Sequence, residues 1–192
     1  MAATAPARQP AFPASPKERL KQIIQELSVL KGKEFKLSSG RKSDVFFDIK
    51  KTVLDPEGAN LIADEVLKIL GRENPQFIGG LVHGAVPLVA AICVKSYPEQ
   101  PIQAFFVRKE PKSHGTNQLI DGHIKDGANV VVLDDVTTTG GSVMKAVEAV
   151  RERGCRVLKV VTIIDRLEGA VANLEAKGIK LVALFTKDDF LH

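Results

Sequence analysis

Short apolar runs that alternate with amphipathic stretches constrain the fold of this chain more than any other feature. From residue 77 onward, strands are predicted at 77–82, 102–107, 130–133, 157–164 and 181–185. Helical patterns lie between most of them, at 86–95, 142–153 and 169–177. Apolar strands joined by helices form right-handed crossovers, so we expect an α/β fold in which helices flank both faces of a central parallel sheet.

The size and composition of the chain fit one globular domain. It has 192 residues, of which 44% are hydrophobic and 26% charged, with a formal net charge of +4. These fractions argue against wholesale disorder, and no apolar run approaches the ~18 residues that span a bilayer. Cys93 and Cys155 are too few for a disulfide framework and are typical of buried thiols in a reducing compartment. We expect a cytoplasmic protein with no membrane partner.

The N-terminal part begins with a stretch of Ala and Pro. Residues 1–14 are predicted to be a disordered tail, although their lack of acids leaves an organellar transit peptide open. Order is expected to begin at Ser15, which has the capping-box spacing to Glu18. Apolar residues at helical spacing up to Leu30 predict a first helix that ends at Gly32.

The middle of the chain contains one segment that breaks the alternation. Two strands, 33–37 and 45–49, are predicted ahead of a second helix that begins at Asp55-Pro56 and stops at Gly71. The segment 108–128, in contrast, has no convincing apolar period. A connection of about 20 residues in a compact domain is either a wrong assignment or a functional lid, and the basic residues at its start favour a lid.

The strongest chemical motif follows the strand at 130–133. Two adjacent carboxylates, Asp134 and Asp135, precede a run that leads directly into a helix: Val136, Thr137, Thr138, Thr139, Gly140, Gly141 and Ser142. Backbone N–H and hydroxyl groups at a helix start bind phosphate. Carboxylates beside them suit ribose hydroxyls or a hydrated Mg²⁺. The motif indicates a sugar-phosphate site, because the alternative of capping aspartates and a solvated loop leaves this order of residues unexplained.

The segment 130–142 closely resembles the phosphoribosyl pyrophosphate (PRPP) signature of the type I phosphoribosyltransferases. Three further segments narrow the resemblance to the orotate phosphoribosyltransferase family: Ser39-Gly40-Arg41-Lys42-Ser43 with Phe46-Phe47, Arg108-Lys109 through Lys112-Ser113-His114-Gly115, and Ile164-Asp165-Arg166. The resemblance covers residues 17–190. It implies one type I phosphoribosyltransferase domain (15–192), with a small N-terminal hood at about 15–50, a core at about 51–190 and a flexible catalytic loop.

The resemblance also implies an activity. This is the transfer of the 5-phosphoribosyl group from PRPP to orotate with Mg²⁺, which gives orotidine 5′-phosphate and pyrophosphate in pyrimidine (UMP) synthesis. The implied catalytic residues are Lys109, Lys112, His114, Asp134 and Asp135, and Arg108 joins the three lid residues in substrate binding. In the family this lid closes over the neighbouring subunit's site, so a homodimer is implied. Mg²⁺ is expected to arrive with the substrate, with the two aspartates contacting it at most through water.

The orotate site carries over in the same way. Phe46-Phe47 matches the family's orotate-contacting pair, Arg166 matches the arginine on the substrate carboxylate, and Thr138 lies where the signature loop touches orotate. From the residues alone, two other readings stay open. Phenylalanines on a strand are also typical core residues. Arg166 has two acids nearby in the sequence, Asp165 and Glu168, with which it could form an ion pair.

Two expected substrate-binding positions depart from the family pattern. Ser38 stands where many members have Lys, so the site uses either a backbone contact there or a nearby cation, Lys42, Lys50 or Lys51. His83-Gly84 replaces an aromatic–Lys pair that some members have on the pyrophosphate side. Gly84 offers a backbone N–H there, and His83 is either a phosphate ligand or an ordinary loop residue.

Two other functions stay open: a phosphoribosyltransferase for another base, and a non-catalytic PRPP-sensing regulator that binds nucleic acid. The first does not need Arg166 or the lid, and the second requires a contiguous basic face. Residues 31–51 hold seven Lys or Arg against three acids, and residues 108–115 hold three against one, which leaves the remainder slightly acidic. The basic excess lies over segments expected to hold anionic substrates, so no nucleic-acid partner is expected.

Overall fold

The computed structural model describes residues 15–36, 40, 42–110 and 118–191. Its helices are α1 (Pro16–Leu27), α2 (Ile49–Val53), α3 (Pro56–Leu70), α4 (Ala85–Ser96), α5 (Gly141–Glu152) and α6 (Ala170–Glu175). Its strands are β1 (Val29–Lys36), β2 (Lys42–Phe47), β3 (Phe77–Leu81), β4 (Gln103–Val107), β5 (Ile120–Gly122), β6 (Asn129–Thr137), β7 (Arg156–Asp165) and β8 (Leu181–Thr186). Two 3₁₀ turns, Gly71–Glu73 and Lys187–Phe190, follow α3 and β8.

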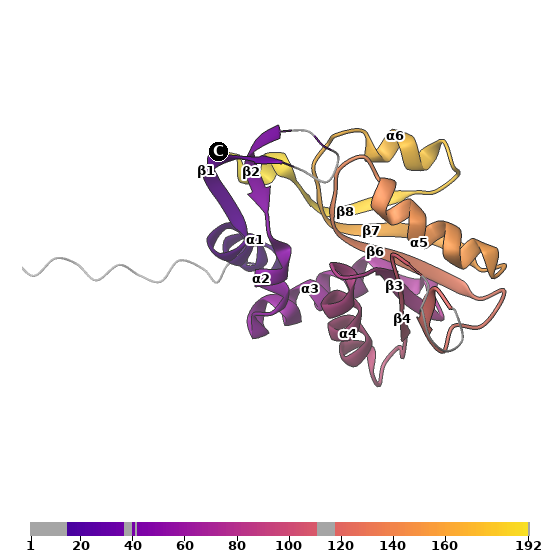
Figure 1. Cartoon of the computed structure of the whole chain (residues 1–192). Coiled ribbons are helices and arrows are strands. Elements are labelled where there is room, and N and C mark those ends of the chain that lie inside the picture. Colours follow the sequence, from indigo (N-terminus) through magenta and orange to yellow (C-terminus); the bar gives the residue numbers. More distant parts are fainter. Residues whose placement is uncertain (1–14, 37–39, 41, 111–117, 192) are drawn as a thin grey trace, which may run out of the picture.

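The larger sheet has the strand order β5-β4-β3-β6-β7-β8 within the described residues (Figure 1). Strands β4, β3, β6, β7 and β8 run parallel, and β5 pairs antiparallel with β4. From β3 the chain passes to β4 on one side, whereas from β6 it passes to β7 on the other side, so the strand order reverses between β3 and β6. The connections that leave β3 and β6 therefore part on opposite faces, and such a point opens a crevice for ligands.

Helices cover both faces of this sheet, as expected. Alternate strand residues point to opposite sides, so Val131 packs with the cluster that includes α3 and α4, whereas Val130 and Val132 pack with α5 and α6. These strand residues are fully buried. Burial on both faces explains why the central strands have near-continuous apolar sequences.

A second sheet lies at one end of the molecule, beside the C-terminus (Figure 1). It consists of β1 and β2, which pair antiparallel, and together with α1 and α2 it forms the unit that we call the hood. The chain end fastens to the hood in two ways. Lys31 Nζ donates a hydrogen bond to the Phe190 carbonyl at 3.1 Å, and the Phe47 and Phe190 rings meet edge to face at 5.7 Å.

The predicted start of the first helix is confirmed, and its predicted end is wrong. Ser15 Oγ accepts a hydrogen bond from the Glu18 N–H at 3.2 Å, as an N-cap should. The helix ends at Leu27 instead of Gly32, because Ser28 is buried with its hydroxyl 2.7 Å from Thr52 Oγ1. The chain then continues as β1, where Leu30 lies opposite Phe46. Strand pairing thus overrides the helical spacing.

One long strand also differs, because the strand predicted at 130–133 continues through the two aspartates to Thr137 as β6. The remaining differences concern short elements. Both hood strands begin earlier than the predicted 33–37 and 45–49, and residue 49 belongs to α2. The segment 108–128 contains the three-residue strand β5. Such short elements carry too little periodicity to be found by pattern. The predicted tail and residues 111–117 of the predicted lid lie outside the described residues. Among the described helices, none is long and apolar enough to cross a membrane.

The tight contact between β3 and its neighbours gives a stability prediction. A Cβ on Gly80 would come 2.2 Å from the Leu133 carbonyl oxygen and 2.6 Å from Ala85 Cβ. We expect Gly80→Ala to lower the free energy of unfolding by about 2 kcal/mol or more, because the backbone of a central strand must move. Urea denaturation measures this. Gln103→Ala, at the exposed start of β4, is the control and should change stability by at most about 0.5 kcal/mol.

Candidate active site

Two adjacent carboxylates end the buried part of β6 at the carboxyl edge of the sheet. Asp134 and Asp135 are half-buried. Thr137, which is only 1% exposed, donates from Oγ1 to Asp134 Oδ2 at 2.9 Å, and the Val136 N–H donates to Asp135 Oδ1 at 3.0 Å. A neighbouring hydroxyl thus fixes Asp134 and a backbone N–H fixes Asp135, while oxygen lone pairs remain for a hydroxyl-bearing ligand.

Burial changes the acidity of this pair. Burial, followed by the charge of Asp135, raises the pKa of Asp134 to about 7. Burial also raises the pKa of Asp135, and the positive charge of Lys50 opposes this effect. Near neutral pH Asp134 is therefore present in both protonation states, so its side chain can accept a hydrogen bond and can also donate one.

The loop after the carboxylates leads into the start of α5. Gly140 caps the helix with φ at +85°, a conformation that favours glycine, and its carbonyl accepts from the Met144 N–H at 3.0 Å. Asn173 of α6 donates from Nδ2 to the Thr139 carbonyl at 2.9 Å. This bond fixes one loop carbonyl toward α6. The first N–H groups of α5, which have no partner within the helix, form an anion-binding end.

The connection after β3 lies directly against the carboxylates. A Cβ on Gly84 would come 2.5 Å from Asp135 Oδ1, so only glycine allows this approach. His83 precedes it and is exposed. The connection after β3 thus contacts Asp135 of β6 at the crevice, which places the predicted pyrophosphate loop beside the predicted ribose site.

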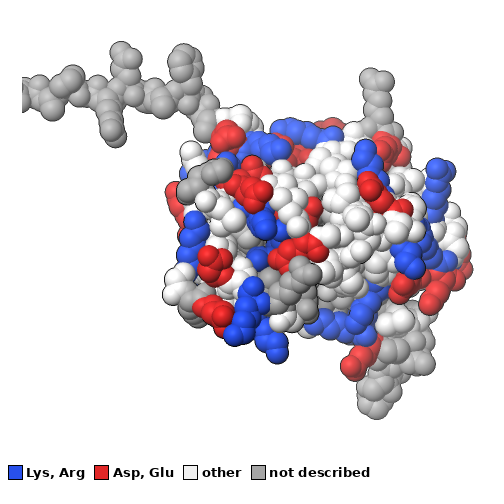
Figure 2. All heavy atoms as spheres, turned by 90° about the horizontal axis from the view of Figure 1, so that it is seen from above, with Lys and Arg blue, Asp and Glu red and all other residues white. Residues whose placement is uncertain are grey.

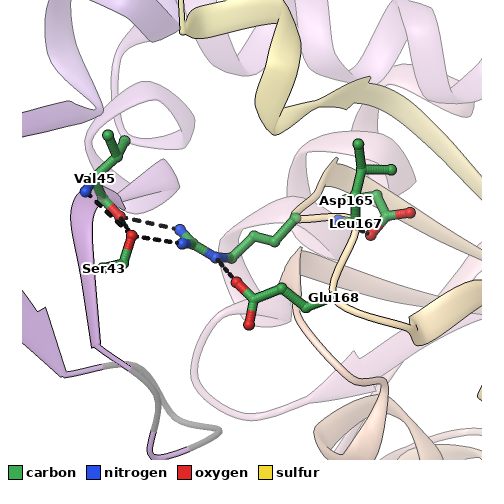
Figure 3. Close-up of polar contacts among 6 residues, drawn as sticks. Ser43, Val45, Asp165, Leu167 and Glu168 are labelled. Atoms are coloured by element: carbon green, nitrogen blue, oxygen red, sulfur yellow. Dashed lines mark hydrogen bonds and ion pairs between the residues drawn. The ribbon is translucent and has the colours of Figure 1, made fainter.

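Arg166, at the end of β7, reaches across to the hood. The residue is 5% exposed, and its three side-chain nitrogen atoms donate to Glu168 Oε1 at 2.8 Å, the Val45 carbonyl at 3.1 Å and Ser43 Oγ at 2.9 Å (Figure 3). Its guanidinium carbon also lies 5.6 Å from the centre of the Phe47 ring. The local ion pair that the sequence left open is therefore present with Glu168.

A cavity of about 180 Å³ joins the hood to the sheet edge. It is lined by Phe46, Phe47, Lys50, Asp135, Val136, Thr138 and Arg166. Six of these were predicted as substrate-binding residues from segments far apart in the sequence. Phe47 is also a core residue, 4% exposed and packed on Phe190, so both readings of this side chain hold. A cavity below the roughly 300 Å³ of drug-sized sites suits a single-ring ligand.

The predicted lid residues are brought to the site only in part. Arg108 pairs with Asp121 at 2.5 Å across the β4–β5 hairpin, and it does not line the cavity of the described structure. Lys109 is exposed beside it. Lys112, His114 and the hood position Ser38 lie outside the described residues.

Lys50 is the cavity residue that the substrate-binding prediction lacked. It lies on α2, a five-residue helix that the sequence pattern missed. From the sequence, Lys50 was only one of three cations near Ser38 that could compensate for the missing Lys. Its position three residues after Phe47, in a basic segment, was the available signal.

The raised pKa of Asp134 predicts a dependence of stability on pH. Between the ordinary pKa of 3.8 and the folded value of about 7, the folded protein holds a proton that the unfolded chain has released. Wild-type stability should therefore fall as the pH rises from about 4 to about 7, by at most about 1.4 kcal/mol per unit.

We expect Asp134→Asn to remove this fall, so that its stability gain over wild type grows across that window and then levels off. Urea unfolding at several pH values measures the gain. The same substitution at exposed Asp44 is the control. A gain for Asp134→Asn that is independent of pH would contradict the assignment.

Known proteins share both the sequence and the fold. Residues 51–187 match the family model of the phosphoribosyl transferase domain. The orotate phosphoribosyltransferase of Bradyrhizobium diazoefficiens is 48% identical over 178 residues, which cover 90% of this chain and 95% of the relative. The crystal structure of the Mycobacterium tuberculosis orotate phosphoribosyltransferase with Fe(III) dicitrate has a TM-score of 0.81 at 34% identity, and the match covers 92% of this chain and 99% of that one.

A second structure of the M. tuberculosis enzyme, in complex with 5-phospho-α-D-ribosyl 1-diphosphate, has a TM-score of 0.76 at 31% identity, with 91% of this chain and 98% of that one covered. The matches extend over the hood as well as the sheet. From its sequence and its fold, this chain belongs to the orotate phosphoribosyltransferase family.

Proposed function

We propose that this chain transfers the 5-phosphoribosyl group from PRPP to orotate, forming orotidine 5′-phosphate and pyrophosphate in the synthesis of UMP. The observation that carries the proposal is the cavity between hood and sheet. It joins an aromatic pair, two basic side chains and Asp135, and so combines features for a flat anionic ring with one for a ribose. The family membership supports the same activity.

The donor would bind along the end of β6 and the start of α5. In this proposal the 5-phosphate lies on the N–H groups and hydroxyls of the segment Thr138–Ser142, and Asp134 and Asp135 accept hydrogen bonds from the ribose hydroxyls. Gly84 packs against Asp135, so its backbone N–H lies close to the proposed ribose site, where it could donate to the pyrophosphate. This arrangement would hold the reacting carbon beside the cavity.

The acceptor would bind in the cavity itself. Arg166 uses three of its five N–H groups on protein oxygens, so it keeps donors for the orotate carboxylate. Phe46 and Phe47 supply an aromatic wall, and Thr138 supplies a hydroxyl. Two reactants held side by side in a fixed geometry avoid most of the entropy cost of their encounter.

The reaction needs positive charge on the departing pyrophosphate, because the ribosyl centre becomes cationic as the bond to pyrophosphate breaks. We assign this charge to Lys109 and Lys112 with Arg108, and proton donation to His114. Arg108 and Lys109 lie at the outer hairpin of the sheet, away from the cavity lining. We therefore propose a homodimer, in which this lid serves the partner's site.

Mg²⁺ fits the donor set of the site. Asp134 and Asp135 present neighbouring carboxylates, which are hard oxygen ligands, and we propose that they contact the ion through water while the PRPP oxygens hold it directly. When bound, Mg²⁺ supplies charge that neutralises the pyrophosphate. The chain's own residues orient the ribose and the base. Because Cys93 and Cys155 are free thiols, as in proteins of a reducing compartment, we assign the protein to the cytoplasm.

The face shown in Figure 2 gives no support to the alternative of a nucleic-acid-binding regulator. Basic and acidic side chains lie next to one another on the face shown in Figure 2. Several described pairs neutralise each other, such as Lys42 with Glu34 at 2.8 Å and Arg153 with Asp126 at 2.7 Å. A contiguous basic face, which phosphate backbones require, is not seen on the described part of this view.

The proposed activity predicts that orotate absorbance falls when PRPP and Mg²⁺ are added to the protein. Lys109→Ala should lower kcat by about 100-fold or more, since a charge on the leaving group is lost, without changing fold or oligomeric state. A panel with uracil and purine bases tests the alternative acceptors. Well-folded dimeric protein that leaves orotate unconsumed would overturn the proposal.

A shared lid predicts complementation between two inactive variants. Lys109→Ala lacks a lid charge and Asp135→Asn lacks a carboxylate of the cavity lining, so each homodimer should be nearly inactive. In a mixed dimer one site receives an intact lid from one subunit and an intact cavity from the other. After subunit exchange, an equal mixture should regain about a quarter of wild-type activity. No recovery, with mixed dimers present by mass spectrometry, would mean that the lid serves its own subunit.

A further inference from the structure

The cavity contains a second basic side chain besides Arg166. The ammonium group of Lys50 pairs with Asp48 at 2.8 Å, and its half-exposed side chain lines the cavity together with Asp135 and Val136 of β6. In contrast, Arg166 is buried and already tied to three protein oxygens. Lys50 is therefore the more adaptable of the two cations.

The position of Lys50 is fixed although its helix is short. On α2, Ile49, Thr52 and Val53 are buried. The Thr52 N–H also donates to Ser28 Oγ at 3.2 Å, which fastens the helix to the end of α1. With its neighbours anchored, Lys50 is held at the rim of the cavity, three residues after the aromatic wall.

The charges around Lys50 keep its ammonium group protonated. The ion pair with Asp48 raises the pKa of Lys50, and Asp135 adds to this. The cavity lining thus contains two basic side chains, Lys50 and Arg166, against one acid, Asp135. Each cation has its own acid beside it, Asp48 at 2.8 Å from Lys50 and Glu168 at 2.8 Å from Arg166, so what favours an anionic ring over a neutral one is the presence of two charged N–H donors in the cavity lining.

The two other cations near Ser38 do not share this position. Lys42 pairs with Glu34 at 2.8 Å, and it lines a different cavity, which shares Phe47 and Arg166 with this one. Lys51 is exposed and is absent from the described cavity lining. Of the three basic residues that stand near this departure from the family pattern, Lys50 is the one that faces the cavity.

We propose that Lys50 is a substrate-binding residue that donates a hydrogen bond to the anionic pyrimidine and, with Arg166, selects it over uncharged bases. This inference rests on the proposed function. The ammonium keeps two N–H groups beyond its contact with Asp48, and a ring carbonyl or the carboxylate of orotate can accept one of them.

The test compares Lys50→Met with Lys51→Met, which removes the same charge one residue away on the same helix. Steady-state kinetics give kcat and the KM of each substrate separately. For Lys50→Met we expect the KM for orotate to rise by about tenfold or more, as for the loss of a charged hydrogen bond. The KM for PRPP should stay within about twofold. Lys50→Arg should recover most of the orotate affinity, and Lys51→Met should behave as wild type.

Three results would overturn the inference. They are an unchanged KM for orotate in Lys50→Met, an equal rise in Lys51→Met, or a rise confined to the KM for PRPP, which would assign Lys50 to the pyrophosphate. Circular dichroism establishes that each variant is folded, and Lys50→Gln repeats the test with a polar side chain. Wild-type protein that consumes no orotate would overturn the proposed function as well, whereas an active wild type with a normal Lys50→Met overturns only this inference.

Discussion

The buried guanidinium of Arg166 is the interaction on which the two halves of the molecule depend. A charge taken out of water must be matched by partners, and removing one of them leaves it uncompensated. Here the partners come from both sheets, Glu168 after β7 and Ser43 and Val45 of β2. The Arg166 N–H also donates to the Thr137 carbonyl at 2.9 Å. One residue thus fixes the hood, the sheet edge and the signature loop relative to one another.

The crevice between β3 and β6 contains two carboxylates, Asp134 and Asp135, whose burial is unfavourable for folding. Burying Asp134 beside Asp135 disfavours the charged forms of both, and their hydrogen bonds to Thr137 and Val136 offset part of that cost. Such perturbed carboxylates are typical of functional sites. The loop after β3 packs closely against Asp135, with no room for a Cβ at Gly84.

The sequence predicted the parts of the fold that have long apolar patterns. It located β3, β7, β8, α3 and α5 to within about two residues, a margin within which assignments of element ends themselves differ. The predicted end of α1 was wrong because long-range contacts determine it. The Ser28 hydroxyl is buried against Thr52, and Leu30 pairs with Phe46 of β2. For the site, motifs identified six of the seven cavity residues. Lys50 was not assigned because nothing local shows which of three nearby cations faces inward.

The division of the cavity wall between two sheets has an evolutionary consequence. The groups proposed for the acceptor come largely from one short stretch, Phe46 to Lys50, whereas those proposed for the donor come from β6 and the start of α5. Insertions or substitutions in β2 and α2 can therefore reshape the acceptor pocket while the proposed phosphate site at the start of α5 stays intact. Because function lies in sites grafted onto folds, such an arrangement lets one donor chemistry serve a succession of nucleobases.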